Sequence, residues 1–200
     1  MLRVGLTGGL ATGKSFIGKT LADLGCCWIQ ADELGHAVLA PGGEAHDAVV
    51  REFGGGILRE DGTIDRQKLA DEVFSRPERL KRLNQLVHPP VIKLEEKLLQ
   101  EFFDREPSGI GVVEAAILFE TGRHTRFDKL IVARCDESVQ LERALRRPGA
   151  TLDQVQARLR RQMPLDEKVR LADYVVDTSG TKQDTADQVR RIYDSLRSVV

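Results

Sequence analysis

Five short runs of apolar residues recur along the chain, and longer segments with helical spacing separate them. The runs, rich in Val and Ile, are residues 2–6, 27–31, 111–116, 130–135 and 174–177. Strands that alternate with helices are typical of a mostly parallel sheet with helices on both faces. The pattern therefore predicts an α/β fold built on a parallel five-stranded sheet flanked by helices.

The interval between the second and third runs, residues 33–108, is too long for a simple connection. Glycines at 42–43 and 54–56 mark turns within it. Helical spacing follows at residues 66–74 and from residue 78 onward, and we expect the Pro89-Pro90 pair to break the second of these helices. The interval predicts a mostly helical insertion on the sheet.

A second insertion, residues 137–172, lies between the fourth and fifth runs. A helix is expected over 138–147, ended by a Pro-Gly pair. Thr151 and Gln154 then have the spacing of a capping box that opens another helix. The predicted core consists of the rest of the chain, residues 1–32, 109–136 and 173–200.

Arginines are concentrated in this second insertion. An arginine-rich helix is by default a solvated face, but one or two of these side chains beside a phosphate site would contact phosphate. The segment would then form a small helical lid that closes over the phosphates. The arginines are Arg143, Arg146, Arg147, Arg158, Arg160 and Arg161.

Composition narrows the class of protein without identifying it. The chain has 200 residues, of which 41% are hydrophobic and 30% charged, with a formal net charge of -1. This composition predicts a soluble globular protein and gives no indication of a nucleic-acid or membrane partner. Cys26, Cys27 and Cys135 have neither disulfide-framework nor zinc-site spacing, so we expect a cytoplasmic protein. The oligomeric state stays open.

The segment TGGLATGKS, residues 7–15, carries the pattern G-x-x-x-x-G-K-S between a predicted strand and a predicted helix. Such a loop turns backbone N–H groups toward phosphate oxygens at a helix N-terminus. It differs from the dinucleotide pattern G-x-G-x-x-G, because Leu10 stands at the second glycine. Lys14 is expected to reach the β- and γ-phosphates of ATP, and Ser15 to ligate Mg²⁺. The predicted nucleotide-binding residues are Gly9, Leu10, Ala11, Thr12, Gly13, Lys14, Ser15 and Phe16.

Motifs that are absent from the chain help to decide between a nucleotide-dependent switch, a motor or transport ATPase and a phosphotransferase. The guanine-reading pattern N-K-x-D is absent, as is a strand followed by D-x-x-G, which a GTPase uses to sense the γ-phosphate. A motor or transport ATPase would need further modules. The sequence therefore favours a small phosphotransferase over a nucleotide-dependent switch.

Two carboxylates are candidates for the chemistry. Asp32 follows the second predicted strand at its carboxyl end, where ligands bind in open parallel sheets. It could serve the acceptor hydroxyl, or it could cap a helix over residues 33–39. Glu114, in the third predicted strand, could support Mg²⁺ from beside the phosphate loop.

Several further segments, in order along the chain, resemble the dephospho-CoA kinase family. The opening GLTGGLATGKS is similar to the family's G-L-T-G-G-I-G-S-G-K-S, and QADELGH to its D-A-D segment. DGTIDRQKLADEVF and LNQLVHP resemble two stretches of its acceptor-binding helical domain. ILFETG is similar to L-L-F-E-T-G, and QMPLDEKVRLADYVVDTSG to Q-M-P-x-E-E-K-x-x-x-A-D-Y-V-I-D-N-S-G. The resemblance covers nearly the whole chain.

This resemblance implies transfer of the ATP γ-phosphoryl to the ribose 3′-hydroxyl of dephospho-CoA, the last step of coenzyme A synthesis. It implies a nucleotide-binding core, a helical CoA-binding domain and a lid, and places Asp32 at the position of the catalytic acid. The lid arginines would be Arg143 and Arg147, and the acceptor would contact Asp32, Arg66, Asn84 and His88. The loop near adenine would be formed by Asp177, Thr178, Ser179 and Gly180.

The chain departs from the family pattern at a few positions. Gln30 replaces the first Asp of D-A-D, so no mechanism here needs that carboxylate. Ala11 and Thr12 replace Gly and Ser in the phosphate loop, and we expect this to be tolerated because the loop binds through backbone N–H groups. Phe16 replaces a Thr, and Glu114 replaces an Asp. Another small-molecule kinase, such as a nucleoside-monophosphate kinase, is the alternative function.

Overall fold

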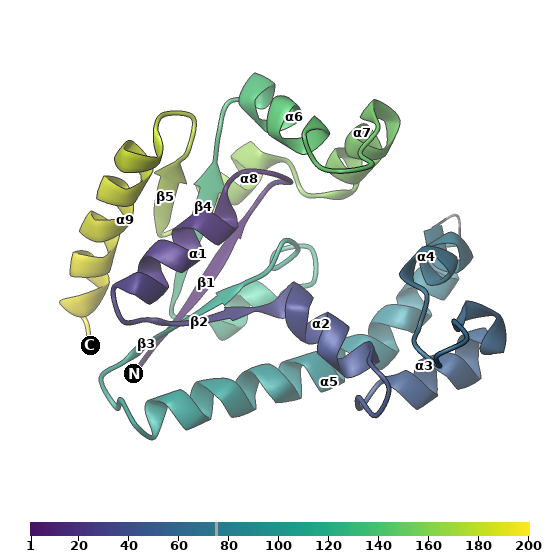
Figure 1. Cartoon of the computed structure of the whole chain (residues 1–200). Helices are drawn as coiled ribbons and strands as arrows, with labels where there is room; N and C mark the ends of the chain where they lie inside the picture. The colour runs from purple at the N-terminus through teal and green to yellow at the C-terminus, as the bar shows by residue number, and fades with distance from the viewer. Residues whose placement is uncertain (75) are drawn as a thin grey trace. The chain divides into compact units, whose positions relative to one another are not determined.

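Among the described residues, 1–74 and 76–200, the computed structural model contains one sheet of five parallel strands (Figure 1). The strands run in the order β2-β3-β1-β4-β5, so their carboxyl ends share one edge and β1 lies at the centre. The five predicted strands are confirmed. Their bounds are β1 Leu2–Gly8, β2 Cys27–Gln30, β3 Ile110–Glu114, β4 Lys129–Arg134 and β5 Tyr174–Asp177.

One face of the sheet is covered by α1 (Lys14–Asp23) and α9 (Lys182–Arg197). Alternate strand residues point to this face, as the two-residue period of a strand requires. The start of α9 is fixed by a capping box between Thr181 and Asp184. The buried cluster includes Val4, Leu6, Ile17, Leu21, Ile131, Val189, Ile192 and Leu196.

A close approach between α1 and β2 depends on a glycine. A Cβ atom on Gly18 would overlap the indole of Trp28. Gly18 is unfavourable in a helix by about 1 kcal/mol relative to Ala. Its missing side chain instead lets the Trp28 ring lie against the backbone of α1, which positions the indole N–H near the end of β3.

The opposite face is covered by α8 (Leu165–Arg170), the loops around η2 (Arg123–Arg126) and the C-terminal end of α5 (Pro77–Phe103). Leu130 and Val132, which alternate with the residues facing α1, pack there with Phe119 and Val169. Gly111 lies against Leu99 and Phe103 of α5. Both faces are therefore covered, as the alternating strand pattern predicted.

Residues Ala31–Leu98 form a second compact unit with its own apolar core, while Met1–Gln30 and Leu99–Val200 form the first. The sequence placed the insertion at 33–108. The observed division falls inside α5, because the last turns of this helix pack on the sheet. The elements of the second unit are α2 Ala31–Leu39, α3 His46–Phe53, η1 Gly55–Ile57, α4 Arg66–Phe74 and most of α5. Its core includes Val38, Val49, Phe53, Ile57, Leu69 and Val91.

The expectation that Pro89-Pro90 breaks a helix is wrong. α5 continues through both prolines to Phe103. A proline inside a helix removes a hydrogen bond and costs about 3 kcal/mol. Apolar side chains before and after the pair, among them Leu83, Val87 and Val91, pack on the core of the second unit. Tertiary packing on both sides offsets the local penalty.

The arginine-rich segment consists of α6 (Glu137–Leu145) and α7 (Leu152–Arg161), followed by α8, and it belongs to the first unit. The predicted capping box is confirmed, since the Thr151 hydroxyl accepts a hydrogen bond from the Gln154 N–H and the Gln154 side chain reaches back. In the part of the chain that the structure describes, no helix has the length and apolar character needed to cross a bilayer.

Candidate active site

The phosphate loop connects the carboxyl end of β1 to the first residue of α1. Gly13 caps the helix with a left-handed backbone, φ +81°, which favours glycine. The loop and the helix N-terminus together present N–H groups that suit an anion. The Lys14 ammonium bridges the loop and donates to the Gly9 carbonyl oxygen at 2.8 Å. The predicted loop therefore forms, with its lysine directed back over it.

Ser15 and Glu114 form the second element of the site. The Ser15 hydroxyl donates to Oε1 of Glu114 at 3.0 Å, and the Trp28 indole N–H donates to Oε2 at 3.1 Å. The Glu114 side chain is buried at the carboxyl end of β3, beside β1. A carboxylate held beside a hydroxyl at the start of a phosphate-binding helix suits Mg²⁺, which takes few protein ligands and completes its shell with water and phosphate oxygens.

Thr178, directly after β5, links three parts of the first unit. Its hydroxyl donates to the Thr12 carbonyl at 3.0 Å, and its own oxygens accept two hydrogen bonds from the Arg143 guanidinium at 3.0 and 2.8 Å. Thr178 is buried. Arg143 of α6 is thus tied to the turn after β5, and that turn to the phosphate loop.

A small cavity of about 170 Å³ opens beside this link. It lies next to the start of α1, since Gly13 and Phe16 both line it. Phe16 contributes an apolar side chain to its lining and Gly180 contributes backbone. The residues that line it are Gly13, Phe16, Arg143, Thr178, Gly180, Lys182 and Thr185.

Asp177 and Ser179 shape that turn. The Ser179 N–H donates to Asp177 Oδ1 at 2.8 Å, and Arg134 pairs with the same carboxylate at 3.2 Å. Burial raises the pKa of Asp177, but the hydrogen bonds from Ser179 and the charge of Arg134 outweigh it, so the pKa lies below its ordinary value. Burial raises the pKa of the neighbouring Cys135 thiol. Asp177 is therefore ionised at neutral pH and the thiol neutral.

Asp32 is an exposed residue of the first turn of α2. The alternative that it caps this helix is wrong, because the helix begins at Ala31, before Asp32. Its strand, β2, pairs with β3 rather than with β1. The carboxylate is exposed, within the helix turn where negative charge is favourable.

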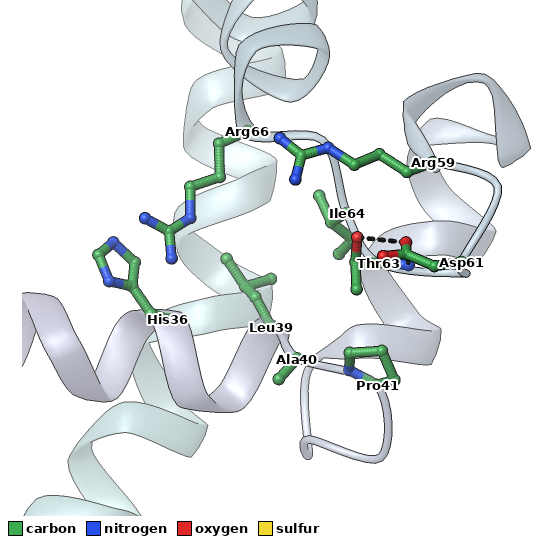
Figure 2. A pocket seen from close by; sticks show the side chains of 9 residues that line it. All are labelled: His36, Leu39, Ala40, Pro41, Arg59, Asp61, Thr63, Ile64 and Arg66. Carbon is green, nitrogen blue, oxygen red and sulfur yellow. Dashed lines mark hydrogen bonds between the residues drawn. The ribbon is translucent and has the colours of Figure 1, made fainter.

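In the second unit, Arg66 lines a pocket of about 450 Å³. Figure 2 shows the side chains of Arg66, Arg59 and His36 directed into the same space, with Thr63 bonded to Asp61 at its far side. Leu39, Ala40, Pro41 and Ile64 supply the apolar part of the wall. The pocket combines two guanidinium groups with apolar surface, which suits an anionic organic molecule.

Asn84 and His88 lie one turn apart on α5 and line a second, more open pocket of about 570 Å³. Lys81 and Gln85 add polar groups to it, and Leu80 an apolar one. Three of the four predicted acceptor residues therefore line pockets of the second unit, Arg66 in one and Asn84 and His88 in the other, whereas Asp32 lines neither.

The role of Trp28 could not be found from the sequence, because it acts through a contact with the distant Glu114 and its own surroundings carry no motif. Thr178 was expected in the loop near adenine, but its hydrogen bonds with Thr12 and Arg143 join distant segments and could not be predicted. Arg147 is exposed just after α6, which ends at Leu145, two residues earlier than the helix expected over 138–147. Among the described residues, no group of three or more His, Cys, Asp or Glu side chains could hold a metal ion. Ser15 and Glu114 are metal-binding candidates beside the phosphate loop because their side chains are hydrogen-bonded to each other there.

Comparison with known proteins points to one family. A family model described as dephospho-CoA kinase matches residues 2–184, from β1 into α9. The dephospho-CoA kinase of Aquifex aeolicus is 39% identical over 196 residues, which cover 98% of this chain and 98% of that protein. The dephospho-CoA kinase of Carboxydothermus hydrogenoformans is 42% identical over 191 residues, covering 94% and 91%.

The fold has a solved counterpart. The crystal structure of TT1252 from Thermus thermophilus matches with a TM-score of 0.79 and 30% sequence identity, and the match covers 98% of this chain and 97% of that one. Sequence and fold comparisons therefore both extend over nearly the full length of the chain.

Proposed function

Because the chain belongs to the dephospho-CoA kinase family, we propose that it uses its phosphate loop and Asp32 to move the γ-phosphoryl of ATP to the ribose 3′-hydroxyl of dephospho-CoA. This reaction completes coenzyme A. The observation that supports it most is the coexistence of a formed G-x-x-x-x-G-K-S loop with family motifs in both units.

ATP is held by the first unit. The backbone N–H groups from Gly9 to Phe16 receive the phosphate oxygens, and Lys14 moves from the Gly9 carbonyl to the β- and γ-phosphates. The adenine end of ATP enters the cavity lined by Phe16 and Gly180. Asp177 and Ser179 act by fixing the turn that carries Gly180.

Mg²⁺ would be held by the Ser15 hydroxyl, with Glu114 in support. When bound, the ion supplies positive charge to the phosphate oxygens as charge develops during transfer. The Ser15 hydroxyl donates to Glu114 in the structure, so its oxygen lone pairs are free to face a cation while the carboxylate orients it. Trp28 in turn fixes the carboxylate.

Asp32 would accept or orient the proton of the acceptor hydroxyl. It lies two positions after Gln30, the end of β2, so its Cα lies within about 7 Å of the carboxyl edge of the sheet. The phosphate loop leaves the sheet at the same edge. An exposed carboxylate that can reach this edge suits general-base catalysis, which is typically worth about 10²–10⁴-fold in rate.

The acceptor would be bound by the second unit. Dephospho-CoA carries a pyrophosphate between its nucleoside and its long pantetheine arm. Guanidinium groups pair with phosphate through parallel hydrogen bonds, so the pocket of Arg66, Arg59 and His36 suits the pyrophosphate. The open groove at Asn84 and His88 offers amide and imidazole groups to the remaining polar parts. His88 is assigned a binding role and no proton transfer.

Arg143 and Arg147 would neutralise the transferring phosphoryl from the lid, residues 137–172. Arg143 already borders the nucleotide cavity, and Arg147 is exposed at the turn between the two helices. Closure of this segment would exclude water and so prevent wasteful hydrolysis of ATP. The free thiols of Cys26, Cys27 and Cys135 suit a cytoplasmic enzyme.

Acceptor-dependent release of ADP tests this function. The purified protein is incubated with Mg²⁺ and ATP, and with dephospho-CoA, a nucleoside, a nucleoside monophosphate or no acceptor. Among these acceptors, we expect only dephospho-CoA to give rapid ADP release. Its product should carry one added phosphate at the 3′ position, as measured by ³¹P NMR. Equal turnover with a nucleoside monophosphate, or equal hydrolysis without acceptor, would contradict the proposal.

A further inference from the structure

Two glutamines hold both backbone groups of one residue in the phosphate loop. The Gln140 side-chain amide donates to the Leu10 carbonyl oxygen at 2.8 Å, and the Gln162 side-chain oxygen accepts from the Leu10 N–H at 2.9 Å. Gln140 is a buried residue of α6, and Gln162 is the first residue after α7. The first turn of α6 and the residue after α7 thus both contact Leu10.

The residue after Leu10 has an unfavourable backbone conformation. Ala11 has φ +58° and is the one non-glycine residue with positive φ in the described part of the chain. The left-handed region disfavours any residue with a Cβ atom, by roughly fivefold to thirtyfold in population. The replacement of a family glycine by Ala11 was expected to be tolerated because the loop binds through backbone groups. The structure shows that the loop forms with a strained residue at this position.

Side chains fix the loop on both sides of Ala11. Before it, Leu10 is held by the two glutamines. After it, the Thr12 carbonyl accepts from the Thr178 hydroxyl at 3.0 Å. A Cβ atom on Gly9 would overlap the Gln140 amide, so the loop backbone lies directly against that side chain. These contacts come from elements far away in the sequence, and they can offset the local preference of Ala11.

We propose that Gln140 and Gln162 are positioning residues that hold Ala11 in its left-handed conformation and so keep the phosphate loop in its ATP-binding form. This inference rests on the proposed function, because it takes ATP as the ligand of the loop. It also ties the helix pair α6–α7 to the loop, so that a movement of the arginines is transmitted to the phosphates through Leu10.

The two contacts require opposite hydrogen-bonding groups, so the two glutamines can be tested by different substitutions. The Leu10 carbonyl needs a donor and the Leu10 N–H needs an acceptor. Gln162→Glu keeps the acceptor oxygen, whereas Gln140→Glu replaces the donor by a second acceptor. In the nucleotide-free protein, Gln162→Glu should therefore preserve protection of the Leu10 amide from hydrogen exchange by NMR, and Gln162→Leu should abolish it.

The decisive experiment is a double-mutant cycle on ATP affinity, measured by calorimetry without acceptor. We expect Gln140→Leu or Gln162→Leu to raise the Kd for ATP about tenfold in the Ala11 protein. In the Ala11→Gly background the same changes should raise it less than about threefold, because glycine adopts the left-handed region without support. Gln156→Leu, an exposed glutamine on α7, is the matched control and should leave the Kd unchanged.

Two results would overturn the proposal. The same fold-change in both backgrounds would mean that the glutamines act through packing alone. An unchanged Kd for ATP in Gln140→Leu and Gln162→Leu of the Ala11 protein would mean that the loop keeps its ATP-binding form without the two glutamines. If Gln140→Leu does not fold, Gln140→Glu, which keeps size and shape, takes its place in the cycle. Failure of the unaltered protein to bind ATP would remove the ATP assignment itself, and this proposal with it.

Discussion

At the scale of single residues, Glu114 organises the proposed metal site. One of its oxygens accepts from Ser15 and the other from Trp28. This arrangement depends on Gly18, because the Trp28 ring occupies the space where a side chain would otherwise begin. A residue with no functional group of its own therefore decides where the carboxylate points.

Gly18→Ala is expected to lower stability and to weaken the metal site. The added Cβ forces Trp28 to move, and such overpacking costs about 1–3 kcal/mol of unfolding free energy. Displacement of the indole also removes a hydrogen bond from Glu114, so the Mg²⁺ concentration at half-maximal turnover should rise. Trp28 is the one tryptophan of the chain, so its fluorescence reports the displacement directly.

Gly35→Ala is the matched control for that change. Gly35 also lies in a helix, but a Cβ atom there would have no neighbour within 4 Å. This variant should gain about 0.5–1 kcal/mol, because alanine favours the helix. Chemical denaturation measures the unfolding free energy of both variants, which should fall in Gly18→Ala and rise in Gly35→Ala. Equal stabilisation by both changes would show that Trp28 does not depend on the glycine.

At the scale of elements, the two predicted lid arginines, Arg143 in α6 and Arg147 after it, have different surroundings. The half-buried Arg143 donates twice to Thr178, which holds the phosphate loop. Arg147 is exposed beyond the end of the helix. The expectation from sequence gave them the same role, whereas the structure gives Arg143 a structural task in addition.

The two arginine variants should therefore fail in different ways. Arg143→Ala should lose about 1–2 kcal/mol of stability and raise the Kd for ATP, because Thr178 loses charged hydrogen bonds. Arg147→Ala should leave the stability and the Kd for ATP unchanged and lower kcat by roughly 10²-fold. Arg160→Ala, an exposed arginine on α7, serves as the control. If Arg147→Ala is no slower than this control, the helix end is a solvated face.

Local motifs explain which elements the sequence could predict. The strands were recognised from runs of Val and Ile, and the phosphate loop from a pattern that acts through its own backbone. The course of α5 could not be predicted, because the core of the second unit outweighs the local effect of Pro89 and Pro90. The contacts of Gln140 and Gln162 with Leu10 join residues more than a hundred positions apart, and no local pattern marks them.

At the scale of the whole molecule, the proposed reaction would draw on both compact units. The phosphate loop and the cavity beside Phe16 belong to the first, and the pockets of Arg66 and Asn84 to the second. The chain passes from one to the other between Gln30 and Ala31. Asp32 is the second residue beyond this point, so the proposed catalytic carboxylate lies at the connection between the units.

The steady-state rate of Asp32→Asn with saturating ATP, Mg²⁺ and dephospho-CoA tests this assignment most directly. Asparagine keeps the shape and removes the basic carboxylate. Glu33→Gln removes a charge from the same exposed helix turn and is the control. We predict that Asp32→Asn lowers kcat by about 10²–10⁴-fold while the ATP affinity and thermal midpoint stay near their original values, and that Glu33→Gln keeps full kcat. Wild-type kcat in Asp32→Asn, or an equal loss in Glu33→Gln, would contradict a catalytic role for Asp32.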